Sequence, residues 1–267
     1  MFDAFTLIAG PCTLEGDDLN LRVARTLARL SVDFGIPIVF KGSFDKANRS
    51  RIESPRGPGL KPGLERLQAV KSETGLPLLT DIHEPQQAGP VGEIVDVVQI
   101  PAFLCRQTDL LVAAGHTGKT VNLKKGQWMA PEEMTAAVEK VRVSGAREVI
   151  VTERGSVHGY GDLVVDMRSF ARIRASCGAS VIFDGTHSVQ RPGLAAGSSG
   201  GDPEHIPALV RAAVAAGCDG LFLETHPDPA EAPSDGTNML PLDRLADVMS
   251  DVLSIRSALG SPHADRG

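Results

Sequence analysis

Apolar and polar positions follow one repeating pattern along the chain. A short, β-branched apolar run is followed by a polar loop and then by a stretch with apolar residues at helical spacing. The runs are continuous rather than alternating, which is typical of strands buried on both faces in a parallel sheet. We predict eight strands, at Thr6–Ala9, Pro37–Phe40, Pro77–Leu79, Asp96–Ile100, Thr120–Leu123, Glu148–Val151, Ser180–Phe183 and Gly220–Leu223.

The stretches between these strands are predicted to be amphipathic helices. One face of the first stretch carries Leu19, Val23, Leu27 and Leu30. Gly35 stands where this helix should end, as glycine commonly does after a helix. The third helix has the weakest pattern, because two glycines and a proline interrupt it within residues 89–92.

Eight strands alternating with eight helices admit two architectures, a closed barrel and an open, doubly wound sheet. We favour an α/β fold of the (β/α)8 TIM-barrel type, because eight is its strand number and no GxGxxG motif opens the first helix. The 267 residues suit one barrel, and no linker or change of composition divides them. We therefore expect a single catalytic domain over residues 1–267, with a disordered tail over residues 260–267.

Composition narrows the class of protein. The net charge of −6 argues against a nucleic-acid partner, and no apolar run reaches the length of about 18 residues that a membrane span needs. The N-terminus lacks the basic residues of a signal peptide. The four cysteines, Cys12, Cys105, Cys177 and Cys218, form no CxxC pair. We expect no membrane partner and a cytoplasmic location, where a functional cysteine acts alone as a ligand or nucleophile.

Polar residues follow every predicted strand. In a TIM barrel the carboxyl ends of the strands and the loops after them form the mouth, where catalytic residues lie. For His83, Lys125 and His226, each taken singly, a surface or capping role is an equally good interpretation. The mouth should carry Cys12, Lys41, Asp81, His83, Gln99, Lys124, Lys125, Glu153, Arg154, Asp184, His187, Glu224 and His226.

The loop after the second strand is the most basic stretch of the chain. Between Lys41 and Lys61 it holds six Lys and Arg residues against two acidic ones, together with several glycines. Such a loop suits phosphate binding through guanidinium and backbone N–H groups, although a solvated run of charges is the plainer interpretation. Because Lys124 and Arg154 add cations to the same mouth, we predict a site for two phosphates, or for a phosphate and a carboxylate.

A metal site is a second possibility at this mouth. Cys12, His187, Glu224 and Asp235 follow strands one, seven and eight, which are neighbours once a barrel closes. Thiolate, imidazole and carboxylate ligands suit Zn²⁺, Fe²⁺ or Mn²⁺. These residues form no spacing motif, so Cys12 is more simply interpreted, from the residues alone, as a small buried apolar side chain.

Longer motifs carry a family resemblance. They are residues 41–50 (KGSFDKANRS), 99–110 (QIPAFLCRQTDL), 122–127 (NLKKGQ), 152–155 (TERG), 184–190 (DGTHSVQ) and 224–227 (ETHP). Together they resemble the 3-deoxy-D-manno-octulosonate 8-phosphate synthases, over essentially the whole chain. The similar 3-deoxy-D-arabino-heptulosonate 7-phosphate synthases share the fold and the phosphoenolpyruvate chemistry. They differ at the positions of Lys46–Ser50, and the motif found here points to arabinose 5-phosphate.

This resemblance implies condensation of phosphoenolpyruvate with arabinose 5-phosphate and water, with release of phosphate. Cys12 implies the metal-dependent class of the family, with His187, Glu224 and Asp235 as the other metal ligands. His187 either only binds the metal or also transfers a proton. The resemblance implies catalytic roles for His187, Lys46, Asp81 and Asp235. It implies substrate contacts from Lys41, Asn48, Arg49, Ser50, Gln99, Arg106, Lys124 and Arg154.

The implied contacts divide between the two substrates. Lys124 and Arg154 are expected at the phosphate of phosphoenolpyruvate, Lys46 near its carboxylate, and Asn48–Ser50 at the sugar phosphate. Arg106 is expected to reach that phosphate from a neighbouring subunit, which implies a homo-oligomer, expected to be a tetramer. The metal either orients the sugar aldehyde and its C2 hydroxyl or activates the water.

Three other functions compete with this one. The nearest is a heptulosonate synthase that uses erythrose 4-phosphate. The second is a metal-dependent aldolase or hydrolase on the same barrel. The third is a phosphosugar sensor that binds without turnover.

Overall fold

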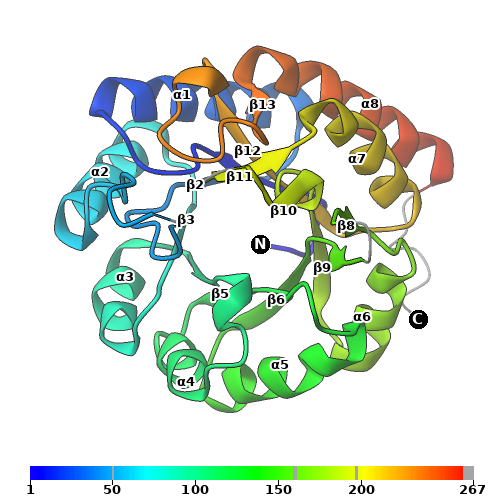
Figure 1. The fold of residues 1–267 in the computed structure, drawn as a ribbon, viewed down its shortest axis with the longest axis horizontal. Helices are drawn as coiled ribbons and strands as arrows, with labels where there is room; N and C mark the ends of the chain where they lie inside the picture. Colours follow the sequence, from blue (N-terminus) through cyan, green and yellow to red (C-terminus); the bar gives the residue numbers. More distant parts are fainter. Residues whose placement is uncertain (50, 159–160, 196–197, 261–267) are drawn as a thin grey trace.

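Eight parallel strands form a closed barrel in the computed structural model, and helices surround it (Figure 1). The structure describes residues 1–49, 51–158, 161–195 and 198–260. Each barrel strand pairs with the next, and the last pairs with the first, from Thr6 opposite Gly220 to Gly10 opposite Glu224. The predicted barrel is thereby confirmed, and the open-sheet alternative is wrong. Most of the predicted disordered tail lies outside the described residues.

Strands and helices alternate as the apolar pattern predicts. The barrel strands are β1 (Thr6–Gly10), β2 (Ile38–Lys41), β3 (Leu78–Asp81), β4 (Val97–Ile100), β5 (Thr120–Lys124), β6 (Glu148–Glu153), β9 (Ser180–Asp184) and β12 (Gly220–His226). The outer helices are α1 (Asp17–Phe34), α2 (Leu60–Thr74), α3 (Ala88–Ile94), α4 (Thr108–His116), α5 (Met134–Val143), α6 (Ser169–Cys177), α7 (Ile206–Ala215) and α8 (Leu245–Leu259). Short 3₁₀ turns are η1 (Pro85–Gln87), η2 (Ala102–Leu104), η3 (Pro131–Glu133), η4 (His187–Val189), η5 (Pro203–His205), η6 (Pro229–Glu231) and η7 (Leu242–Arg244).

The strand boundaries differ from the predicted ones in a consistent direction. Predicted starts at Pro37 and Pro77 are one residue early, because proline has no N–H to donate to a neighbouring strand. Most strands also continue beyond their last apolar residue, as β12 does through Glu224 to His226. The polar residues of the mouth therefore belong to the parallel ladder itself, which fixes their backbone.

The core consists of two layers. A large cluster fills the space between the strands and the outer helices. A smaller one fills the barrel interior and consists of Phe2, Ile8, Val39, Leu79, Val97, Ile150, Ile182 and Phe222. Burying these side chains stabilises the fold and closes the barrel below the mouth, because a TIM barrel is filled by side chains and is not a pore.

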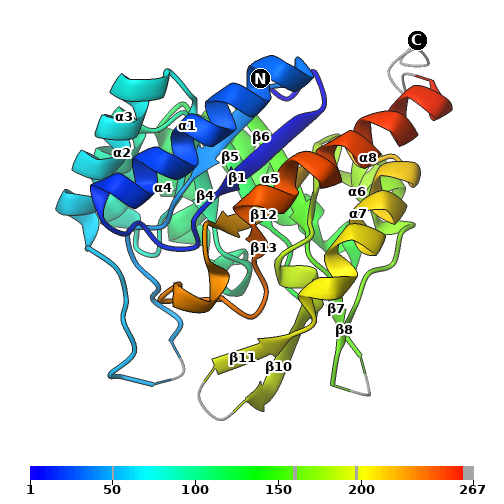
Figure 2. The same ribbon diagram turned by 90° about the horizontal axis from the view of Figure 1, so that it is seen from above.

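Additional strand pairings lie outside the eight barrel strands and were not predicted from the sequence. They are β7 (Ser156–Val157) with β8 (Leu163–Val164), β10 (Gln190–Ala195) with β11 (Ser198–Gly201), and β13 (Leu240–Pro241) alongside β12. Figure 2 shows both hairpins and the long loop after β2 projecting from the same end of the barrel, away from the N-terminus. This end is the mouth.

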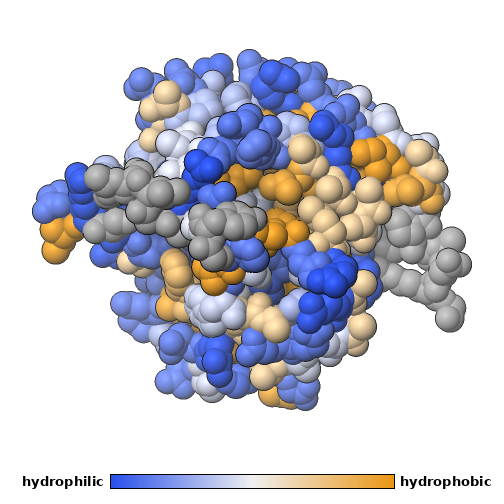
Figure 3. Space-filling view, turned by 45° about the vertical axis from the view of Figure 1, so that its right-hand side comes forward, coloured by the Kyte–Doolittle hydropathy of each residue, from blue (hydrophilic) through white to orange (hydrophobic). Residues whose placement is uncertain are grey.

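The outer surface is mixed in character. On the face seen in Figure 3, hydrophobic residues adjoin one another from the centre toward the upper right, with hydrophilic residues above and below them. Among the described residues, no helix is long and apolar enough to cross a membrane.

Candidate active site

The alternation of side chains along each strand decides which residues reach the mouth. Val39 on β2 belongs to the inner apolar layer, so Lys41, two positions later, also faces the barrel interior. The same step leads from Ile182 to Asp184 on β9. Lys125 follows Lys124, which faces inward, so by the same alternation its side chain points outward from the barrel toward the helices. There it is fully buried.

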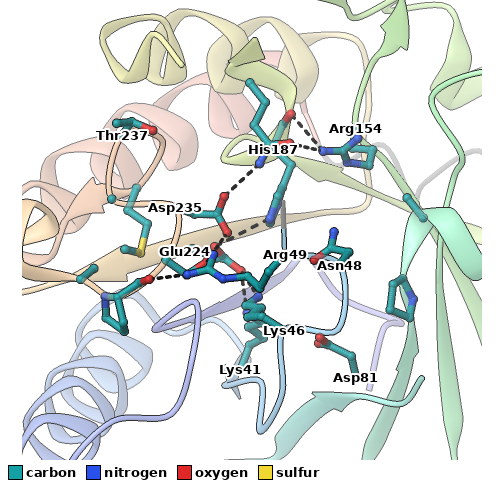
Figure 4. A pocket seen from close by; sticks show the side chains of 18 of the residues that line it. Lys41, Lys46, Asn48, Arg49, Asp81, Arg154, His187, Glu224, Asp235 and Thr237 are labelled. Atoms are coloured by element: carbon teal, nitrogen blue, oxygen red, sulfur yellow. Dashed lines mark hydrogen bonds and ion pairs between the residues drawn. The ribbon is translucent and has the colours of Figure 1, made fainter. Parts of the chain in front are cut away.

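A cavity of about 1030 Å³ occupies the mouth (Figure 4). Two of the described site residues do not line it: Cys12 is buried next to Asp235, and Arg106 is exposed elsewhere on the surface. Ser50, also predicted, lies outside the described residues. The cavity wall includes all the others, namely Lys41, Lys46, Asn48, Arg49, Asp81, Gln99, Lys124, Arg154, His187, Glu224 and Asp235.

A thiol and two carboxylates meet at one side of this cavity. Donor atoms of Cys12, Glu224 and Asp235 all lie within 4.8 Å of one another. The Cys12 Sγ donates to Asp235 Oδ2 at 3.0 Å, and His187 Nε2 lies 3.8 Å from Glu224 Oε2. Cys12, Glu224 and Asp235 therefore form one group, called the acidic cluster below, and His187 lies beside it next to Glu224. Glu224 is on β12, whereas the other three predicted ligands follow β1, β9 and β12.

The charge states of this cluster follow from its surroundings. Burial raises the pKa of the Cys12 thiol far above its usual value, and the charges of Asp235 and Glu224 add to the effect. Burial alone would also raise the pKa of Glu224, but the charges of Lys41, His187 and Lys46 outweigh it and the pKa is lowered. Two carboxylates beside a protonated thiol therefore face one point.

This donor set fits a divalent transition metal. Glu224 Oε2 is buried and has no hydrogen-bond partner among the described residues, an arrangement that is costly unless something binds there. One sulfur, one imidazole nitrogen and carboxylate oxygens are the donors that Zn²⁺, Fe²⁺ and Mn²⁺ accept. A metal would also favour the thiolate form of Cys12, because metal binding releases the proton of a ligand thiol.

Lys41 is committed to this cluster by its contacts. Its Nζ donates to Glu224 Oε1 at 2.5 Å and to the Cys12 carbonyl at 2.7 Å, and its side chain is 1% exposed. Lys41 borders the cavity, but these contacts orient Glu224 and the first loop. Lys41 therefore has a structural role in holding Glu224, beside its predicted role as a substrate ligand.

Asp184 connects the two sides of the mouth. Its Oδ2 accepts from Lys124 Nζ at 2.7 Å and from His187 Nδ1 at 2.8 Å. Burial alone would raise the pKa of Asp184, but the charges of His187 and Lys124 lower it well below its usual range. The sequence placed Asp184 at the mouth but suggested no role for it, because its importance depends on what it contacts.

Arg154 offers a free donor to the cavity. Its Nη2 donates to Gln190 Oε1 at 2.7 Å, whereas its buried Nη1 has no hydrogen-bond partner among the described residues. Burial lowers the pKa of Arg154, with the charge of Asp184 opposing the shift, but a guanidinium stays protonated at neutral pH. An anion in the cavity would satisfy this donor.

A row of hydrogen-bonded side chains supports the part of the cavity wall that Asp81 and Gln99 form. Gln99 Nε2 donates to Asp81 Oδ1 at 2.9 Å, Asn122 Nδ2 donates to Gln99 Oε1 at 2.9 Å, and Thr152 Oγ1 donates to Asn122 Oδ1 at 2.7 Å. Ser43 Oγ also donates to Asp81, at 2.9 Å. The row fixes both Asp81 and Gln99, because each is held by strand neighbours.

Lys46 lies between this row and the acidic cluster (Figure 4). Its Nζ donates to Ser43 Oγ at 3.2 Å and lies 3.9 Å from Glu224 Oε1. Burial alone would lower its pKa, but the negative charges of the Glu224 and Asp81 carboxylates raise it well above the usual value. Lys46 is therefore a firmly protonated cation inside the cavity.

Arg49 joins the loop after β2 to the loop after β12. Its two terminal nitrogens donate to Ser234 Oγ at 2.7 Å and to the Pro233 carbonyl at 2.6 Å, while its buried Nε has no hydrogen-bond partner among the described residues. Asn48, next to it, is exposed and lines the cavity. These two residues form a polar rim on the β2 side.

His226 and Lys125 have structural surroundings. His226 Nδ1 accepts from the Asp228 N–H at 3.0 Å, and its Nε2 lies 3.1 Å from Glu15. Lys125 Nζ donates to the carbonyls of Gly126 and Met129.

The fold and the cavity together define a TIM-barrel protein with a cation-lined cavity beside the acidic cluster.

Comparison with known proteins gives the family. The sequence profile described as the DAHP synthetase I family matches residues 3–258. The chain is 53% identical to the 2-dehydro-3-deoxyphosphooctonate aldolase of Nitratidesulfovibrio vulgaris, over 94% of this chain and 92% of the relative. It is 52% identical to the Synechococcus protein of that name, over 96% and 90%, and 53% identical to that of Koribacter versatilis, over 97% and 93%. The chain belongs to the DAHP synthetase I family, and the resemblance predicted from its motifs is confirmed.

Proposed function

We propose that this protein condenses phosphoenolpyruvate with D-arabinose 5-phosphate and water to give 3-deoxy-D-manno-octulosonate 8-phosphate and inorganic phosphate. The observation that carries the proposal is one cavity with cations on two sides and the Cys12–Glu224–Asp235 cluster within it. Two anionic substrates repel each other, so a site that joins them needs cations for each. The names of the relatives support the same reaction.

Lys124 and Arg154 bind the phosphate of phosphoenolpyruvate in this proposal. They come from β5 and from the end of β6, which are adjacent strands, and the free Nη1 of Arg154 supplies a donor. Lys46 binds near the carboxylate, because it is a cation only 12% exposed that lies between the polar row and the acidic cluster. Together these residues hold the enol with C3 facing the centre of the cavity.

The sugar phosphate binds at the β2 side of the mouth. Asn48 and Arg49 line the cavity there, and the same motif continues into Ser50, which lies outside the described residues. Arg49 is already fixed by the loop after β12, so little side-chain entropy is lost when it binds phosphate. The aldehyde at the other end of the sugar then points toward the acidic cluster.

The reaction forms one C–C bond and breaks one C–O bond. C3 of the enol attacks the aldehyde carbon, whose oxygen takes up a proton, and water adds at C2 before phosphate leaves with its bridging oxygen. Lys46 and Asp81 lie where they can stabilise charge and position hydroxyl groups, and the fixed row through Gln99 keeps Asp81 in place. His187 and Asp235 are the groups we assign to proton handling beside the cluster.

A divalent metal, Zn²⁺, Fe²⁺ or Mn²⁺, is part of the proposal. Cys12, His187, Glu224 and Asp235 would hold it, and when bound it would supply Lewis-acid polarisation of an oxygen. The buried, unpartnered Glu224 Oε2 and the fit of the donor set support this assignment.

A homo-oligomer, which we expect to be a tetramer, completes the proposal. Arg106 precedes α4, is exposed and does not line the cavity of its own chain. In a tetramer this side chain would reach the sugar phosphate of a neighbouring subunit. We expect Arg106→Ala to raise the KM for arabinose 5-phosphate about 10-fold, the effect of losing one charged hydrogen bond. Unchanged kinetics in a protein that sediments as a tetramer would contradict this role.

A cytoplasmic location belongs to the same proposal, and cell fractionation would test it.

Phosphate release from phosphoenolpyruvate tests the reaction. We expect release with arabinose 5-phosphate but not with erythrose 4-phosphate, lost after treatment with a strong chelator and restored by a divalent metal. Preference for erythrose 4-phosphate would identify the heptulosonate synthase instead. Release that survives complete removal of metal would keep the reaction and exclude the metal from it.

A further inference from the structure

We propose that Asp184 is a positioning residue that couples the metal site to the phosphoenolpyruvate site, because one oxygen of its carboxylate holds both His187 and Lys124. This inference rests on the proposed function, which assigns those two side chains to metal and phosphate. Asp184 is the last residue of β9 and is fully buried.

The carboxylate of Asp184 has all of its hydrogen bonds in place. Oδ1 accepts from the backbone N–H groups of Thr186 at 3.0 Å and His187 at 2.8 Å. Oδ2 accepts from Lys124 Nζ at 2.7 Å and His187 Nδ1 at 2.8 Å. The backbone contacts fix the orientation of the carboxylate, so Oδ2 presents a fixed point of negative charge to two functional side chains.

This contact decides which nitrogen of His187 can bind a metal. A carboxylate only accepts hydrogen bonds, so the imidazole nitrogen beside it, Nδ1, carries a proton. The lone pair of the neutral ring then lies on Nε2, which lies 3.8 Å from Glu224 Oε2 at the acidic cluster. Metal-ligating histidines are commonly oriented in this way by a carboxylate.

The same oxygen holds Lys124. The Lys124 ammonium lies 3.6 Å from the centre of the Phe222 ring and 3.3 Å from His187 Nδ1. The ammonium and the imidazole N–H are both hydrogen-bond donors, and the negative charge of Asp184 holds them next to each other. Without this charge Lys124 would move away from the imidazole. Asp184 thus sets the position of Lys124 and the tautomer of His187 together.

Asp184→Asn tests this coupling. The amide oxygen would stay on the two backbone N–H groups, so the amide NH₂ would face Lys124 and His187. It would donate to Nδ1, place the ring proton on Nε2, and repel the ammonium. We expect zinc affinity, measured by competition with a chromophoric chelator, to fall about 10–100-fold. We expect the Kd of phosphoenolpyruvate for the metal-free protein to rise about 10-fold.

Asp219→Asn is the matched control. Asp219 is also a buried carboxylate that accepts from a backbone N–H, that of Val181 at 2.8 Å, and from a cation, Arg174 at 2.9 Å. It directly precedes β12, at the end of the barrel away from the mouth. We expect both affinities of this variant to stay within about 2-fold of the wild type, since Asp219 lies at the opposite end of the barrel from the site.

Two background variants separate the two contacts. When the protein already carries His187→Ala, adding Asp184→Asn should no longer change the zinc affinity but should still weaken the binding of phosphoenolpyruvate. When it already carries Lys124→Met, adding Asp184→Asn should still lower the zinc affinity. An Asp184→Asn protein with both affinities unchanged, or with only one changed, would contradict the coupling.

A measurement on the wild-type protein avoids any folding defect of the variant. Nitrogen-15 NMR of the histidine rings in the metal-free protein should show His187 protonated at Nδ1, and a neutral ring protonated only at Nε2 would overturn the inference. None of these readouts involves the acceptor sugar. A protein that binds zinc and phosphoenolpyruvate but does not turn over arabinose 5-phosphate would therefore contradict the proposed function, while the result for Asp184 would stand.

Discussion

Cys12 supplies the only sulfur donor of the acidic cluster among the described residues. Its replacement should therefore change the metal affinity of the cluster. We predict that Cys12→Ser lowers zinc affinity by at least about 10-fold, because a serine hydroxyl is a harder and far less acidic ligand than a thiol. Turnover should fall in parallel. Titration with zinc against a competing chelator measures the first effect, and phosphate release the second.

Cys177→Ser is the control for this variant. Cys177 is also buried and lies near the hydroxyls of Thr135 and Ser176, so serine is tolerated there, and it ends α6 far from the mouth. Equal zinc affinity in Cys12→Ser and Cys177→Ser would exclude Cys12 as a ligand.

Arg49 belongs to one substrate in our proposal, which makes its kinetic effect specific. We predict that Arg49→Ala raises the KM for arabinose 5-phosphate about 10-fold or more, as expected for the loss of charged hydrogen bonds to phosphate, with a much smaller effect on phosphoenolpyruvate. Steady-state kinetics with each substrate varied in turn measure both. Equal changes in the two KM values would show that Arg49 does not serve the sugar phosphate alone.

At the residue scale, sequence identifies the chemistry of a side chain but not its partners. Lys41 was predicted to contact substrate, yet its charge is paired with Glu224. Asp184 was placed at the mouth without a role, because nothing local in the sequence shows that it meets Lys124 from β5. Both facts depend on strands that are far apart in the chain.

At the scale of elements, the packing of β1 against β2 depends on a missing side chain. Gly10 ends β1 with φ 154°, and a Cβ atom there would lie 2.0 Å from the Lys41 carbonyl oxygen. We predict that Gly10→Ala lowers the free energy of unfolding by about 1–3 kcal/mol, the usual cost of overpacking, and displaces Lys41. Chemical denaturation and zinc affinity together measure these effects.

Gly16→Ala provides the comparison for that variant. Gly16 has φ −62°, an ordinary value for any residue, and a Cβ atom there would meet nothing within 4 Å. Its stability should stay within about 0.5 kcal/mol of the wild type, as for most surface substitutions. A Gly10→Ala protein as stable as Gly16→Ala would show that the strands can separate without cost.

The long elements were predictable and the short ones were not. Apolar runs located all eight barrel strands, and Gly35, in the left-handed conformation, ends α1 as predicted. The β7–β8 and β10–β11 pairings escaped prediction, because two-residue strands and a glycine-rich segment show no alternation to detect. These segments surround the mouth, so the parts nearest the chemistry carried the weakest structural signal.

At the scale of the whole molecule, the acidic cluster sits where the barrel closes. Cys12 follows β1 and Glu224 lies on β12, the first and last strands of the barrel, which pair along their length. His187 follows β9, which pairs with β12 from the other side. A metal bound to these residues would link three segments that are joined only by the folded barrel, and it would have no comparable site in the unfolded chain.

Metal binding should therefore stabilise the native protein. A ligand at about 100 times its Kd that binds only the folded state adds about 2.7 kcal/mol, which for a domain of this size raises the unfolding midpoint by about 5–10 °C. We predict such a rise when Zn²⁺ is added to chelated protein, measured by calorimetry. Ca²⁺ at the same concentration should have little effect, because it prefers a shell of oxygen ligands. A 10-fold lower affinity reduces the stabilisation to about 1.4 kcal/mol, so the rise should be about half as large or less in Cys12→Ser. An equal rise in both proteins would place the stabilising metal somewhere other than the acidic cluster.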